Sequence, residues 1–192
     1  MNISVFLSYS RPYTEAQKSF KEGVSKYLDD YLGFSARTLG DTDYDPDEPL
    51  TACRRLMVEC NGLITLAFRR YYLEKGFEYA DNSNQGQLDD KKTKKPIEPK
   101  PLNEIYFTSP WCQIEAAMAF SLGLPILVLR ERGVSPRGLM KKGISGIYLP
   151  EFDLDKGGEN YLETQEWKEI SNEWSGLVRA VRRAKGYPHR VY

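Results

Sequence analysis

The stretch ISVFLSY, residues 3–9, decides the fold. It is a continuous apolar and β-branched run that is short for a helix, which is typical of a strand buried on both faces of a parallel sheet. Similar runs are expected to form strands further along the chain. They cover residues 34–39, 62–68 and 124–129, and a short fifth strand is expected within 146–152.

Amphipathic segments alternate with these strands. Ala16, Phe20 and Val24 recur at helical spacing, and Ser109 followed by Pro110 is a typical N-cap and first-turn pair. The helices are expected at about 16–31, 49–60, 109–121 and 162–185. This alternation predicts one α/β domain over residues 1–192, with a parallel sheet covered on both faces and ligands bound at the carboxyl ends of its strands.

Composition excludes several classes of protein. Lys plus Arg (27) equals Asp plus Glu (27), so no excess charge points to nucleic acid or an anionic membrane. The first ten residues do not resemble a signal peptide, and no apolar run reaches the roughly 18 residues that a membrane span needs. Three cysteines without a CxxC pair are expected to be reduced thiols. We therefore expect a cytoplasmic protein.

A long insertion is expected at about residues 70–107. Its centre, about 80–104, contains few aliphatic residues, three prolines and a lysine cluster at 91–95. Such a composition predicts a mobile or extended segment. The lysines lie between acidic residues, so a solvated loop is favoured over an anion-binding one.

The only histidine, His189, lies near the C-terminus, which disfavours nucleophilic triads and zinc sites of the HExxH type. The turn after residue 9 lacks the glycines of a dinucleotide-binding Rossmann fold, and no P-loop motif is present. A phospho-accepting receiver domain would need an acidic residue where Ser8, Ser10 and Arg69 stand. No metal ligand set is expected, and any catalysis is expected to use carboxylates.

The segment SPWCQIE, residues 109–115, is the strongest candidate for chemistry. Trp111, Cys112 and Glu115 share a helix face. Glu115 also lies beside an apolar stripe, expected to face the sheet, that contains Trp111, Ile114, Met118 and Leu122. A carboxylate at such an edge is desolvated and could bind a ribose or stabilise an oxocarbenium ion. The alternative is an ordinary exposed helical glutamate.

Here the sequence resembles the Toll/interleukin-1 receptor (TIR) domains. The resemblance covers most of residues 1–152 and includes VFLSYS at 5–10, the acidic loop 40–48 at the place of the BB loop, and the S-x-W-C-x-x-E pattern at 109–115. It implies a flavodoxin-like fold, with a long insertion before the WCxxE helix, that cleaves the nicotinamide–ribose bond of NAD+. NAD+ would be the substrate, and no cofactor is implied.

The resemblance also implies residue roles. Glu115 would be catalytic. Substrate-binding roles fall to Ser8, Tyr9, Ser10, Arg11, Trp111 and Cys112. Assembly into a homo-oligomer through the acidic loop would use Asp41, Asp43, Tyr44 and Asp45, for which an ordinary solvated turn is the alternative.

The chain is similar to free-standing bacterial TIR proteins of the Thoeris anti-phage system, which make cyclic ADP-ribose-type signals for a separate effector protein. Two alternatives remain open at this point. One is a nucleosidase similar to the nucleoside deoxyribosyltransferases, and the other is a non-catalytic TIR interaction or adaptor module.

Overall fold

The computed structural model describes residues 3–79, 99–142 and 149–185. Five strands form one parallel sheet in the order β2-β1-β3-β6-β7. They are β1 (Ile3–Tyr9), β2 (Phe34–Arg37), β3 (Leu63–Ala67), β6 (Ile126–Glu131) and β7 (Glu151–Phe152). The predicted α/β class and the five parallel strands are confirmed.

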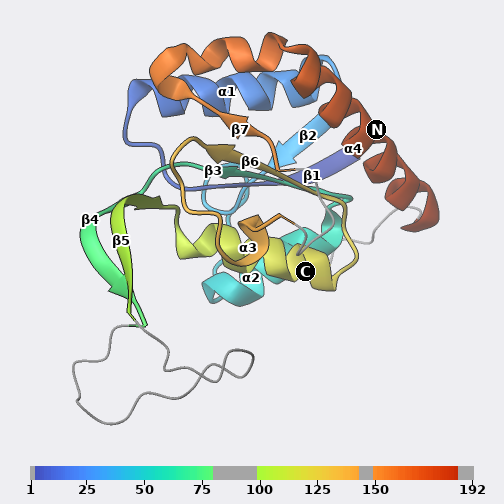
Figure 1. The fold of residues 1–192 in the computed structure, drawn as a ribbon. Helices are drawn as coiled ribbons and strands as arrows, with labels where there is room; N and C mark the ends of the chain where they lie inside the picture. Colours follow the sequence, from blue (N-terminus) through green and yellow to red (C-terminus); the bar gives the residue numbers. More distant parts are fainter. Residues whose placement is uncertain (1–2, 80–98, 143–148, 186–192) are drawn as a thin grey trace.

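Helices cover both faces of this sheet (Figure 1). They are α1 (Glu15–Asp30), α2 (Pro49–Glu59), α3 (Pro110–Ser121) and α4 (Gln165–Lys185). Helices α1 and α4 pack on one face, and α2 and α3 pack on the other. Three short 3-10 helices lie in the connections before α4, at Gly138–Met140, Leu154–Lys156 and Gly158–Glu163.

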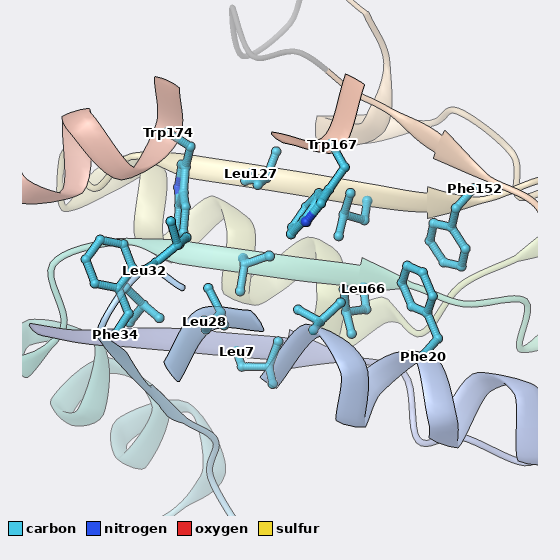
Figure 2. Packing of buried hydrophobic residues seen from close by; sticks show 14 of the residues in the cluster. Leu7, Phe20, Leu28, Leu32, Phe34, Leu66, Leu127, Phe152, Trp167 and Trp174 are labelled. Atoms are coloured by element: carbon cyan, nitrogen blue, oxygen red, sulfur yellow. The ribbon is translucent and has the colours of Figure 1, made fainter. Parts of the chain in front are cut away.

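Strand β1 supplies both hydrophobic cores because successive side chains of a strand point to opposite faces. Leu7 packs toward α1 and α4, whereas Phe6 packs toward α2 and α3. In the first core, the rings of Phe20 and Phe152 stack with centroids 4.1 Å apart, and Trp167 is fully buried nearby (Figure 2). This burial on both sides explains why the run at residues 3–9 carries no charged residue.

The ends of the predicted insertion form a β-hairpin that the sequence analysis did not predict. Strands β4 (Tyr71–Glu78) and β5 (Lys100–Phe107) pair antiparallel and form a separate two-stranded sheet. Residues 100–104, expected to be mobile or extended, are therefore part of an ordered strand. Residues 80–98, with the lysine cluster, and residues 143–148 of the predicted last strand lie outside the described residues.

The strand order places a topological switch point beside β1. The chain passes from β1 outward to β2 on one side and then to β3 on the other. The loops that leave β1 and β3 therefore diverge at the carboxyl edge of the sheet, and such divergence is where open α/β sheets form ligand clefts. This order is that of flavodoxin-like sheets.

Candidate active site

An open cleft of about 730 Å³ lies at the carboxyl end of β1. It lies at the switch point, where ligands bind in open α/β sheets. Most of the residues predicted to bind substrate line it, together with residues of the acidic loop and of the segment before β4. The lining includes Ser8, Tyr9, Arg11, Thr38, Gly40, Asp41, Arg70, Tyr71, Ser109, Trp111 and Glu115.

Glu115 reaches the cleft from the inward side of α3. The helix packs on the sheet through Cys112, Ala116 and Ala119, which are all buried. The prediction that the stripe faces the sheet is wrong for Trp111, which is 40% exposed, whereas Met118 and Leu122 pack against the second core. Apolar side chains occur on all sides of α3, so the apolar pattern alone does not show which face packs on the sheet. The small residues pack there because they let the helix approach the sheet closely. Glu115 is consequently more enclosed than its sequence position indicated.

Of the rest of that stripe, Ile114 is 37% exposed, and Met118 and Leu122 are only partly buried. The shift of face matters for the site because it turns Glu115 toward β1 and α2. An exposed helical glutamate, the alternative that the sequence left open, would make neither contact.

The surroundings of Glu115 shift its protonation. Burial raises the pKa of its carboxyl above the ordinary 4.5, and the side chains of Ser8 and Cys53 act against this rise. The Cys53 thiol donates to Oε1 of Glu115 across 3.6 Å. Burial, followed by the charge of Glu115, raises the pKa of Cys53 to about 12, so the thiol stays protonated and remains a donor.

Ser8 lines the cleft beside Glu115, with its hydroxyl buried. Its side chain is 1% exposed, and its Oγ has no hydrogen-bond partner of normal geometry among the described residues. An unsatisfied buried hydroxyl is costly, and such groups often mark places where a ligand or water binds. The Ser8 hydroxyl therefore acts on Glu115, whose pKa it lowers, from a buried position at the wall of the cleft.

Ser10 and Cys112 do not line the cleft, contrary to the predicted binding role. Both are fully buried behind it. Ser10 Oγ lies 2.6 Å from the hydroxyl of Thr108, accepts the backbone N–H of Ser109 at 3.0 Å, and lies 3.6 Å from Cys112 Sγ. These contacts join the end of β1 to the start of α3, which fixes the helix that carries Glu115.

The acidic loop is held by basic residues of the same chain. Asp41 accepts hydrogen bonds from Tyr9 Oη at 2.9 Å and Lys21 Nζ at 2.7 Å, and the bond from Lys21 is the largest cause of its lowered pKa. Asp43 pairs with Arg37.

Further along the loop, Asp45 pairs with Arg55 at 3.0 Å. Tyr44 is 90% exposed. The three carboxylates therefore have structural partners within the chain, and Tyr44 is the exposed aromatic residue of the loop.

Sequence analysis missed Arg70 and Tyr71. Arg70 lies in the short connection between β3 and β4, and Tyr71 is the first residue of β4. The fold predicted a site in the loop after β3, so position was a signal that could have identified them. It also missed Glu131, which is 4% exposed at the end of β6. Glu131 accepts hydrogen bonds from Gln17 Nε2 at 3.0 Å and from the backbone N–H of Arg69 at 2.8 Å. Burial is the largest cause of its raised pKa.

No cluster of three or more His, Cys, Asp or Glu side chains suited to a metal ion occurs among residues 3–79, 99–142 and 149–185. His189 lies outside these ranges. Within the same described part of the chain, no helix is long and apolar enough to cross a membrane. The sequence matches no protein-family model and none of the curated proteins with which it was compared.

Proposed function

We propose that this chain is a TIR-type enzyme that cleaves the nicotinamide–ribose bond of NAD+. The observation that carries the proposal is the position of Glu115, a partly buried carboxylate in a cleft at the carboxyl end of β1. The WCxxE pattern and the flavodoxin-like strand order support the same family.

Glu115 has a clear task in this reaction. Nicotinamide in NAD+ is a cationic leaving group, so it departs as a neutral molecule with the electron pair of the broken C–N bond. Positive charge then develops on the ribose, and an ionised carboxylate held in a sheltered cleft stabilises it. Attack by water releases a proton and gives ADP-ribose, whereas attack by a group of the same molecule gives a cyclic product.

The wider role we propose is signalling in bacterial anti-phage defence from the cytoplasm, as in the Thoeris system. The product would be a cyclic ADP-ribose-type messenger that acts on a separate effector protein. Homo-oligomers would form through the acidic loop, where Tyr44 is the residue most available for contact.

Product analysis tests the proposal against its two alternatives. The purified chain at high concentration is incubated separately with NAD+, nucleosides and nucleoside monophosphates, with and without extract of phage-infected bacteria, and the products are separated by mass. The proposal predicts nicotinamide and a cyclic product from NAD+. Linear ADP-ribose alone contradicts the messenger role. Turnover of nucleosides or nucleoside monophosphates, with NAD+ left intact, supports the nucleosidase. Intact NAD+ together with binding of a TIR partner by both wild type and Glu115→Gln supports the adaptor.

A further inference from the structure

We propose that Arg70, from the inserted hairpin, and Arg11, from the loop after β1, form a clamp for the diphosphate of NAD+ at the mouth of the cleft. This inference rests on the proposed function and adds to it a position for the substrate and a role for the insertion. Both arginines line the cleft, and both are exposed.

The Arg70 guanidinium lies against the main chain of Arg11, and both side chains belong to the lining of one cleft. Arg70 Nη1 donates to the backbone carbonyl oxygen of Arg11 at 3.4 Å, which links the two segments. Among the described residues, neither guanidinium forms an ion pair with a carboxylate. Asp41, the carboxylate of the acidic loop that lines the cleft, is already paired with Lys21 at 2.7 Å. Two arginine side chains that line one cleft without a carboxylate partner favour a dianionic ligand with oxygens for both.

The neighbouring residues Arg69 and Arg70 have different roles: Arg69 makes structural contacts, whereas Arg70 lines the cleft. Arg69 Nε donates to the carbonyl oxygen of Arg132 at 2.7 Å, and Arg69 Nη1 pairs with Asp155 at 2.9 Å. Arg70 is held through its backbone, whose N–H donates to the carbonyl oxygen of Phe107 at 2.8 Å. The hairpin thus fixes the main chain of Arg70 and leaves most of its guanidinium donors available in the cleft.

Two further features suit an anion at this place. Ser109, the N-cap of α3, lines the same cleft, so the positive end of a 12-residue helix begins there. Ser8, whose buried hydroxyl has no hydrogen-bond partner of normal geometry among the described residues, lines the same cleft as Glu115. If Arg11 and Arg70 hold the diphosphate, the adjoining ribose lies in the same cleft as Ser8 and Glu115.

Calorimetric titration tests the clamp without requiring turnover. The ligands are ADP-ribose, inorganic pyrophosphate and adenosine, and the proteins are wild type, Arg70→Ala, Arg70→Lys and Arg54→Ala. Arg54 is an exposed arginine of α2 outside the cleft, so it controls for the loss of one positive charge. Loss of a charged hydrogen-bond donor is expected to weaken ADP-ribose and pyrophosphate binding about tenfold in Arg70→Ala. The affinities of Arg70→Lys should lie between those of wild type and Arg70→Ala, and the affinities of Arg54→Ala should match those of wild type.

The outcomes separate the clamp from the proposed reaction. Equal affinities of wild type and Arg70→Ala for ADP-ribose would overturn the clamp, as would equal losses in Arg54→Ala or no measurable binding of ADP-ribose to wild type. A loss of adenosine affinity as large as that of ADP-ribose would also overturn it, because adenosine lacks the diphosphate. Arginine-dependent ADP-ribose binding in a chain that leaves NAD+ intact would support the clamp and contradict the reaction.

Discussion

Replacing Cys53 by alanine is predicted to raise the pKa of Glu115 further. The thiol donates to Oε1 of Glu115 at 3.6 Å and opposes the effect of burial. A donor to the charged form of an acid lowers its pKa, so removing the donor raises it. A thiol is a weak donor, so we take about 0.5–1 kcal/mol for the lost stabilisation of the carboxylate. Since one pH unit corresponds to about 1.4 kcal/mol, the titration midpoint should move upward by roughly half a unit.

The assay is a carbon NMR titration of the Glu115 carboxyl, whose signal is assigned by its absence in Glu115→Gln. Cys53→Ser keeps a donor and should titrate closer to wild type than Cys53→Ala does. Cys60→Ala is the matched control, because Cys60 is an equally buried thiol near Arg37 and Lys185 with no contact to Glu115. An unchanged midpoint in Cys53→Ala, or the same shift in Cys60→Ala, would refute the reasoning.

Two predictions concern stability. Because burial raises the pKa of Glu115, folding favours its protonated form. The stability that the protonated carboxyl contributes is fully present below the unfolded pKa and is lost as pH rises through the folded pKa. Glu115→Gln should therefore have the same Tm as wild type near pH 4 and a higher Tm at pH 8. The difference should be about 2–4 °C for each kcal/mol of unfolding free energy. A higher Tm of wild type at pH 8 would contradict this. At Gly62, an added Cβ would lie 2.6 Å from Val178 Cγ2, so Gly62→Ala should cost about 1–3 kcal/mol in denaturant unfolding. Gly176→Ala, with no atom within 4 Å of its Cβ, is the control and should be neutral or stabilising.

The first strand and the helix that carries Glu115 were predictable because their signals are local. Residues 3–9 form β1 with the predicted bounds, and Ser109 caps α3 as expected through a bond from the N–H of Trp111 to its Oγ at 3.3 Å. Alternation of strands and helices was enough to predict the parallel sheet. The carboxyl edge of that sheet then indicated where a cleft should form.

The rest of the site depended on tertiary packing. Because apolar residues occur all around α3, the sequence did not show that its small residues face the sheet. The burial of Glu115 was therefore greater than the sequence indicated. Ser10 and Cys112 lie behind the cleft because one buried hydrogen-bond group joins β1 to α3. The hairpin was missed because charged residues, Gly76 and Pro101 interrupt the apolar residues of its strands, which depend on cross-strand pairs such as Tyr72 with Tyr106.

The measurement that tests the central claim most directly is the release of nicotinamide from NAD+ by the purified chain, compared among wild type, Glu115→Gln and Glu22→Gln. Glu22 is an exposed residue of α1 outside the cleft, so its substitution removes an equal charge elsewhere. The account predicts nicotinamide from wild type and Glu22→Gln, and a loss of at least about a hundredfold in Glu115→Gln, as for removal of one group that stabilises developing charge. Equal rates in wild type and Glu115→Gln, or intact NAD+ with wild type at high concentration and with infected-cell extract, would contradict it.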